Sequence, residues 1–121
     1  MREALYLDDE VLIGLDGQFI LEQIGFTSVH LVHNSDEALA VVNSRTIAFA
    51  LLDVNLGRNQ TSLPLARELE RRGIVFAFVS GYNRDEDLTG SFTAPFVSKP
   101  FSHATVQTAL NDALTVERLR Q

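Results

Sequence analysis

The stretch that decides the fold is Ile-Ala-Phe-Ala-Leu-Leu-Asp at residues 47–53, in which six apolar residues run into one aspartate. A short, continuous apolar run is typical of a strand that is covered on both faces of a parallel sheet. Doubly wound α/β proteins place their binding sites at the carboxyl ends of such strands. Asp53 therefore stands where a site residue is expected.

Four other apolar runs can form strands beside this one. They are Ala4 to Leu7, Ser28 to Val32, Ile74 to Val79 and Pro95 to Val97. Longer segments at helical spacing lie between the runs, and this alternation is typical of βα units on a parallel sheet. Because 121 residues are about the size of one domain, we expect a single α/β domain over residues 1–121.

Apolar residues three or four positions apart predict the helices and their buried faces. A first helix is predicted to end at Gly25, a second to begin at Asn34 or Ser35, a third to run from about Ser62 to Arg72, and a last one to begin at Ser102. The stretch Asn83 to Thr93 has no clear period, so the fourth helix is expected to be short or frayed. The residues predicted to be buried are Leu12, Leu15, Phe19, Ile20 and Ile24 in the first helix and Val106, Ala109, Leu110, Ala113 and Leu114 in the last.

The composition argues against several classes of protein. The net charge is −6 and the basic residues are dispersed except for Arg71-Arg72, so binding to nucleic acid is not expected. No apolar run approaches the roughly 20 residues that span a bilayer, and the N-terminus lacks a signal-peptide pattern. Cysteine is absent, which excludes disulfides and thiolate metal sites. We therefore expect a cytoplasmic protein without membrane contact.

Polar residues follow the other predicted strands as Asp53 follows its own. The pair Asp8-Asp9 comes after the first run, Ser80 after the fourth, and Lys99, the only lysine of the chain, after the fifth. The carboxyl ends of parallel strands meet at one edge, so these side chains are expected to form one site. Carboxylates with water and phosphate oxygens suit Mg²⁺, and a carboxylate can act as the nucleophile toward a phosphoryl donor. The set predicts a metal-assisted phosphoryl acceptor.

These motifs together resemble the receiver domain of two-component response regulators over the whole chain. The resemblance implies a flavodoxin-like (βα)5 fold with a five-stranded parallel sheet in the order 2-1-3-4-5. It implies phosphorylation of Asp53 by a histidine kinase or phosphotransfer protein, with Mg²⁺ held by Asp8, Asp9, Asp53 and the backbone carbonyl of Asn55. It also implies a cis Lys99-Pro100 bond that aims the amine inward. No enzyme activity is expected beyond this phosphorylation and its reversal.

Two stretches depart from the usual receiver pattern. Gly57 stands where most receivers have proline, four residues after the acceptor, so the loop that follows is expected to be more mobile than usual. The stretch Phe78 to Tyr82 resembles a subgroup named for its Phe-Ala-Thr-Gly-Tyr motif, many of whose members lack an output domain. Such a protein signals through a protein partner or a phosphorelay. Ser80, Tyr82 and Phe96 are the expected switch residues.

Simpler interpretations stay open beside this one. Asp8-Asp9 could only begin a helix, and Ser80-Gly81 could be an ordinary turn. The fold could serve as a phosphorylation-independent interaction module. A Mg²⁺-dependent phosphohydrolase of the haloacid dehalogenase type also uses a strand-end aspartate, but it requires aspartate where this chain has Asn55. The three histidines, His30, His33 and His103, have no metal-like spacing and are expected to be structural or surface residues.

Overall fold

Strands and helices alternate along the chain as the sequence predicts. The computed structural model describes residues 2–81, 89–90 and 92–120, so Tyr82 and most of the segment predicted as a fourth helix lie outside the described residues. The elements are β1 (Glu3–Leu7), α1 (Val11–Ile24), β2 (Ser28–Val32), α2 (Ser35–Ser44), β3 (Phe49–Asp53), α3 (Leu63–Arg72), β4 (Phe76–Ser80), β5 (Phe96–Ser98) and α5 (His103–Arg120).

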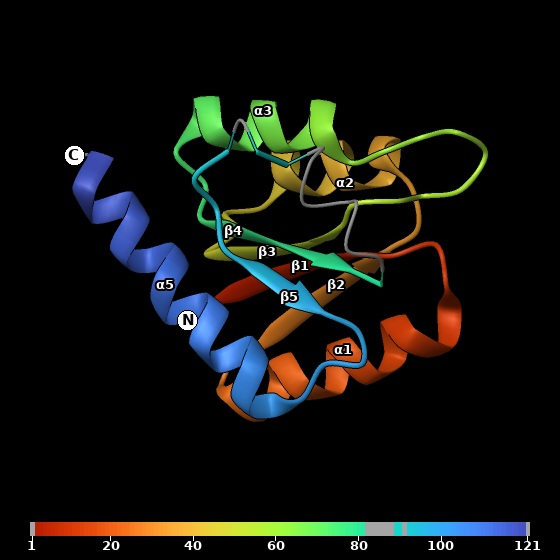
Figure 1. Ribbon diagram of the computed structural model, residues 1–121, viewed down its shortest axis with the longest axis horizontal. Coiled ribbons are helices and arrows are strands. Elements are labelled where there is room, and N and C mark those ends of the chain that lie inside the picture. The colour runs from red at the N-terminus through yellow and green to blue at the C-terminus, as the bar shows by residue number, and fades with distance from the viewer. Residues whose placement is uncertain (1, 82–88, 91, 121) are drawn as a thin grey trace.

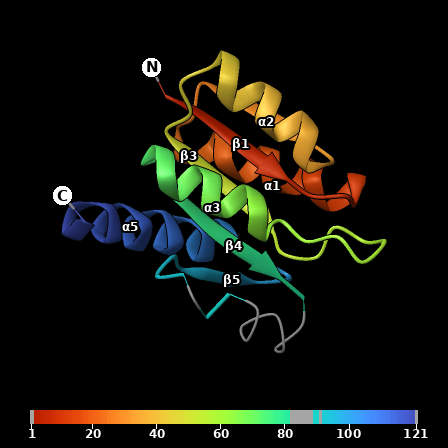
Figure 2. The ribbon, with the colours of Figure 1, turned by 90° about the horizontal axis from the view of Figure 1, so that it is seen from above.

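All neighbouring strands pair in parallel, in the order β2-β1-β3-β4-β5. Helices α1 and α5 cover one face of the sheet, and α2 and α3 cover the other (Figures 1 and 2). This is the doubly wound, flavodoxin-like fold, and the predicted strand order 2-1-3-4-5 is confirmed. Within the described residues, none of the helices combines the length and apolar character needed to cross a membrane.

Two hydrophobic cores form because each strand sends alternate side chains to opposite faces. Leu5 and Leu52 pack toward α2 and α3, whereas Tyr6 and Leu51 pack toward α1 and α5. All five residues of β3 and all five of β4 are buried. Burial on both faces explains why these two strands read as continuous apolar runs instead of alternating patterns.

The predicted helix ends agree closely with the structure. Asn34 is the N-cap of α2, where its side chain accepts a hydrogen bond from the backbone N–H of Glu37 at 2.9 Å. Gly73 ends α3 with a left-handed φ of 72°. In α5 the predicted residues Val106, Ala109, Leu110 and Ala113 are buried, and Leu114 is partly buried against the same core.

The predicted buried face of α1 is wrong for three of its five residues. Leu12, Leu15 and Phe19 are exposed, with Leu12 80% and Phe19 60% accessible, and only Ile20 and Ile24 pack against the core. The helix meets the sheet instead through Gly14, Gly17 and Leu21.

Tyr6 and Leu31 are the reason why α1 turns small residues to the sheet. A Cβ atom at Gly17 would lie 1.8 Å from Cε2 of Tyr6, and one at Gly14 would lie 2.8 Å from Cδ1 of Leu31. The tyrosine ring therefore fills the space that a larger side chain of the helix would take. The apolar residues of α1 are left facing solvent.

Candidate functional site

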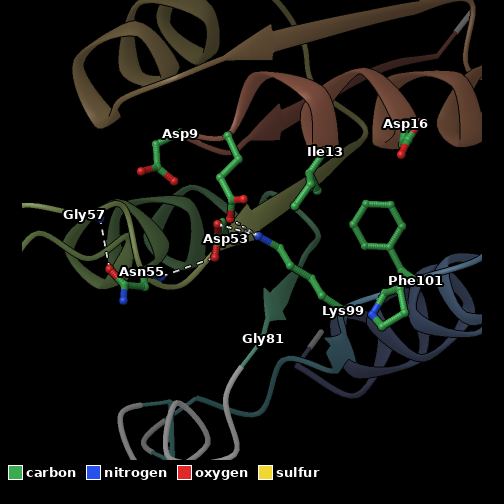
Figure 3. Close-up of a pocket in the computed structure, with 11 residues that line it drawn as sticks. Asp9, Ile13, Asp16, Asp53, Asn55, Gly57, Gly81, Lys99 and Phe101 are labelled. Atoms are coloured by element: carbon green, nitrogen blue, oxygen red, sulfur yellow. Dashed lines mark hydrogen bonds and ion pairs between the residues drawn. The ribbon is translucent and has the colours of Figure 1, made fainter.

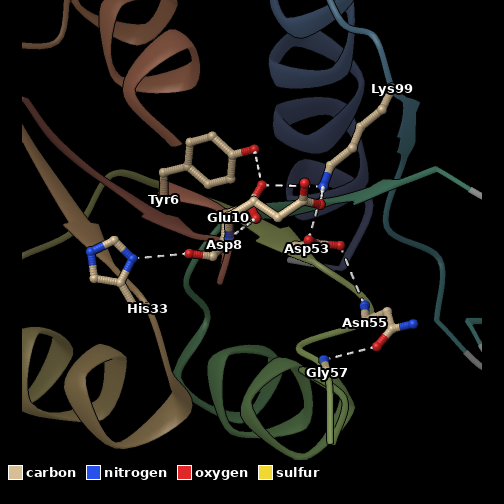
Figure 4. A network of polar contacts seen from close by, with 8 residues as sticks. All are labelled: Tyr6, Asp8, Glu10, His33, Asp53, Asn55, Gly57 and Lys99. Carbon is tan, nitrogen blue, oxygen red and sulfur yellow. Dashed lines mark hydrogen bonds and ion pairs between the residues drawn. The ribbon is translucent and has the colours of Figure 1, made fainter. Parts of the chain in front are cut away.

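The ends of three strands bring the predicted site residues together. Asp8 follows β1, Asp53 ends β3 and Lys99 follows β5. The Lys99 ammonium (Nζ) lies 3.0 Å from Oδ2 of Asp53 (Figure 3) and 3.3 Å from Oδ2 of Asp8 (Figure 4). Lys99 thus forms ion pairs with two buried carboxylates that lie 46 and 91 positions before it in the sequence.

Asp8 is fully buried, and its carboxylate is held from several directions. The Tyr6 hydroxyl donates to Oδ2 at 2.7 Å, and the backbone N–H of Glu10 donates to Oδ1 at 2.8 Å. The Nδ1 atom of His33 lies 3.1 Å from the backbone oxygen of Asp8 (Figure 4). Burial with these partners fixes the orientation of Asp8.

The described residues contain one acidic cluster at this edge. Asp8, Asp9, Glu10 and Asp53 each offer a carboxylate oxygen, and these atoms lie within 4.8 Å of one another. Four carboxylates beside a single amine form an excess of negative charge, and oxygen donors are those that Mg²⁺ prefers. The donor set fits the expected Mg²⁺ ion.

The pKa values in the cluster reflect burial first and charge second. Burial raises the pKa of Asp53 to about 7; Lys99 opposes this rise, and the nearby Asp8 charge adds to it. Burial also disfavours the charged form of Lys99, but its hydrogen bond and attraction to Asp53 and Asp8 outweigh this, so its pKa is raised. Lys99 therefore stays protonated while Asp53 titrates near neutrality.

A pocket of about 640 Å³ opens beside the cluster. Its polar side is lined by Asp9, Asp53 and Lys99, and its apolar side by Ile13 of α1 and by Phe101 (Figure 3). The pocket is large enough for a small phosphorylated molecule or for one side chain of a partner. Asp53 is thus one of the residues that face this pocket.

The remaining predicted residues lie around this centre. Ser80 is buried at the end of β4, and its carbonyl accepts a hydrogen bond from the backbone N–H of Lys99 at 2.8 Å. The Lys99-Pro100 bond is cis, as the resemblance implies. Phe96 is partly buried at the start of β5. Tyr82 is outside the described residues.

The loop after Asp53 forms a defined turn. Asn55 donates its backbone N–H to Oδ1 of Asp53 at 3.3 Å, and its side-chain oxygen accepts from the N–H of Gly57 at 2.9 Å. Gly57, Arg58 and Asn59 all have positive φ angles, a conformation for which glycine is well suited at the first position. The higher mobility expected of this loop stays a prediction.

Sequence reasoning missed two polar members of the site, Tyr6 and Glu10. Tyr6 stands in the middle of an apolar strand and reads as a core residue, so only the fold reveals its bond to Asp8. Glu10 could have been noticed because it is the third consecutive acid after Asp8 and Asp9. Its contact with Lys99, at 3.3 Å, joins residues 89 positions apart.

Comparison with known proteins places this chain among signalling regulators. It is 35% identical to SdrG from Sphingomonas melonis, with a TM-score of 0.81 and coverage of 94% of this chain and 97% of that one. A CheY-like response regulator receiver domain from Methylobacillus flagellatus is 23% identical, with coverage of 93% and 98%, and its TM-score of 0.78 shows the shared fold. No family model matches the chain.

A longer curated protein is also similar. The phyllosphere-induced regulator PhyR of Methylorubrum extorquens is 26% identical over 116 residues, which make up 93% of this chain and 43% of PhyR. This chain therefore spans less than half the length of that relative.

Proposed function

Since this chain belongs to the response regulator receiver domains, we propose that it accepts a phosphoryl group on Asp53 and passes the signal to a protein partner. The observation that carries the proposal is the buried Asp53 carboxylate with the Lys99 ammonium 3.0 Å away, at the base of an open pocket. The donor is a phosphohistidine of a histidine kinase or phosphotransfer protein.

The proposed reaction transfers a phosphoryl group from a histidine nitrogen to a carboxylate oxygen of Asp53. A carboxylate oxygen of Asp53 attacks phosphorus, the P–N bond of the phosphohistidine breaks, and its electron pair stays on the imidazole, leaving an acyl phosphate on Asp53. Lys99 offsets the charge on the phosphoryl oxygens, and the Ser80 hydroxyl moves in to donate to another oxygen. The movement of Ser80 lets Phe96 turn inward, and this biases a two-state element.

Mg²⁺ is the cofactor that the proposal requires. When bound, it neutralises the carboxylates and orients the phosphoryl oxygens. Asp9, which is exposed, would be a direct ligand together with Asp53 and the backbone carbonyl of Asn55. Asp8, whose carboxylate is already engaged by Tyr6 and Lys99, would hold the metal through water.

The donor's docking surface is a strip on α1, made of Val11, Leu12, Leu15 and Phe19. All four are exposed large hydrophobic residues, and Ile13 and Asp16 of the same helix line the pocket. A protein that covers the strip is therefore positioned to insert a histidine toward Asp53. The strip suits a protein donor, because a small phosphorylated molecule has no use for it.

The finer assignment follows the sequence motifs. We place the chain in the subgroup named for its Phe-Ala-Thr-Gly-Tyr motif, as a cytoplasmic receiver. Its downstream partner binds the face formed by β4, β5 and α5. It acts as a phosphorelay shuttle, as a sink that drains a kinase, or as a direct regulator.

Two other functions are less well supported. An interaction module independent of phosphorylation has no need for four carboxylates around one amine. A phosphohydrolase of the haloacid dehalogenase type requires a second aspartate at the position of Asn55, whose side chain here bonds to Gly57.

Intact mass after incubation with acetyl phosphate and Mg²⁺ tests the proposal. We expect one phosphoryl adduct in the wild type, none in Asp53→Asn and none after chelation of the metal. Asp112→Asn, which removes an exposed acid of α5, is the matched control and keeps the adduct. Steady phosphate release indicates a phosphatase, and no adduct at all indicates an inert module. An adduct that persists in Asp53→Asn refutes the assignment of the acceptor.

A further inference from the structure

Glu10 reaches across the site from the start of α1 to Lys99. Its Oε1 atom lies 3.3 Å from Nζ of Lys99 (Figure 4). The two side chains differ in exposure, since Glu10 is 58% accessible and Lys99 only 14%. Glu10 is therefore the solvent-side partner of an ammonium that is otherwise shared by the buried Asp8 and Asp53.

Helix capping does not explain this orientation. Glu10 is the N-cap residue of α1, but its side chain makes no capping hydrogen bond. The backbone supplies the local contacts instead, with the Glu10 carbonyl accepting from Gly14 at 2.9 Å and the Glu10 N–H donating to Asp8. The carboxylate can thus be changed without removing a cap.

The Glu10 carboxylate lies on the route to Asp53. It lines the pocket, and its oxygen lies within 4.8 Å of a carboxylate oxygen of Asp53. Any phosphoryl group that approaches Asp53 through this pocket comes close to a negative charge that, among the described side chains, pairs with Lys99. Because Glu10 is exposed, its side chain has room to swing toward solvent once Lys99 turns to the phosphoryl oxygens.

We propose that Glu10 is a specificity-determining residue that selects among phosphoryl donors by charge. It slows transfer from small, freely diffusing anionic donors, whereas a protein donor is held by contacts elsewhere on the surface. The inference rests on the proposed function, because it requires Asp53 to be the acceptor. Glu10 repels the incoming donor and pairs with Lys99, but it does not bond to the transferred phosphoryl group. It is therefore a positioning residue.

Coulomb's law gives the size of the effect. With about 6 Å between the Glu10 carboxylate and the donor, and a dielectric constant of about 80, the repulsion lowers the transfer rate roughly threefold for each negative charge on the donor. Removal of the Glu10 charge is therefore expected to accelerate a dianionic donor about tenfold and a monoanionic donor about threefold. An electrostatic role is identified by comparing the two accelerations: the dianionic donor is expected to gain more from the loss of the Glu10 charge than the monoanionic donor.

The test compares Glu10→Gln with wild type, using dianionic acetyl phosphate and monoanionic phosphoramidate at saturating Mg²⁺ and low, constant ionic strength. Phosphorylation rates are read by intact mass, and Mg²⁺ affinity is titrated separately. We expect Glu10→Gln to gain more with acetyl phosphate than with phosphoramidate, and Glu10→Asp, which keeps the charge, to behave more like wild type. Glu22→Gln removes an equal, exposed charge twelve positions further along α1, roughly 18 Å away, and is expected to change neither rate.

Three outcomes overturn the inference. Unchanged rates in Glu10→Gln, or equal acceleration with both donors, exclude selection by charge. Slower transfer with a large loss of Mg²⁺ affinity makes Glu10 a metal ligand instead. Failure of the proposed function looks different, because the wild type then takes up no phosphoryl group from either donor.

Discussion

Replacing Asp53 with asparagine is expected to stabilise the metal-free protein at alkaline pH. Asp53 is only 4% accessible, and burial is the main cause that raises its pKa to about 7 from an ordinary value of 3.8. Ionisation of this group therefore opposes folding. Asparagine has nearly the same shape and cannot ionise.

The sign and size of the effect follow from proton linkage. Between the two pKa values the folded protein keeps the Asp53 proton that the unfolded chain has released, so stability falls as pH rises through this window. The slope is about 1.4 kcal/mol per pH unit, which amounts to about 3 kcal/mol between about pH 5 and pH 8. Lys99, whose pKa is raised, stays protonated throughout this range and does not contribute.

Urea unfolding of both proteins in chelator, at several pH values, measures this difference. The lowered pKa values of Glu3 and Glu68 affect both proteins equally and cancel in the comparison. We expect the advantage of Asp53→Asn to grow with pH and to shrink when Mg²⁺ is added to the wild type. Asp112→Asn is expected to follow the wild type. Parallel pH profiles for wild type and Asp53→Asn would refute the reasoning.

Four further changes test the surroundings of the site. Gly17→Ala places a Cβ atom 1.8 Å from Tyr6 and is expected to cost about 1–3 kcal/mol in urea unfolding, whereas an unchanged midpoint would show that the ring can move away. Tyr6→Phe removes a hydrogen bond to the buried Asp8 carboxylate, so a loss of about 1.5–3 kcal/mol is expected; a neutral result would mean that other donors replace it. Asp9→Ala is expected to weaken Mg²⁺ binding in a titration while the metal-free fold keeps or gains stability, and an unchanged affinity contradicts its role as ligand. Phe19→Ser is expected to slow transfer from a phosphohistidine protein and to leave the rate with acetyl phosphate unchanged, and equal loss with both donors would exclude a docking role.

The fold was predictable because a strand that is buried on both faces of the sheet has a continuous apolar sequence. β3 and β4 are apolar throughout, so neither their existence nor their central place depends on detailed packing. The face of α1 was not predictable from the same reasoning. Apolar spacing treats the largest residues as buried, but Tyr6 occupies the space beside the helix and leaves room only for glycine at position 17.

The site residues likewise divide into those that the sequence predicts and those that it does not. Asp8 and Lys99 each follow a strand and Asp53 ends one, and parallel topology alone brings such positions together. The contacts of Tyr6 and Glu10 depend on which way a side chain points within the assembled edge, which no local pattern encodes. Tyr6 and Glu10 could therefore be assigned to the site only from the three-dimensional structure.

The charge balance of the cluster argues that this edge is shaped by chemistry and not by stability. When all groups are ionised, four carboxylates face one ammonium, and Asp8 and Asp53 are both buried. Repulsion of this kind lowers the stability of the resting fold, and an uncharged residue at position 53 would relieve it. A purely structural edge gains nothing from this arrangement. Under the proposed function the arrangement has a use, because the carboxylates would hold a divalent cation and Asp53 would accept a phosphoryl group that Lys99 stabilises.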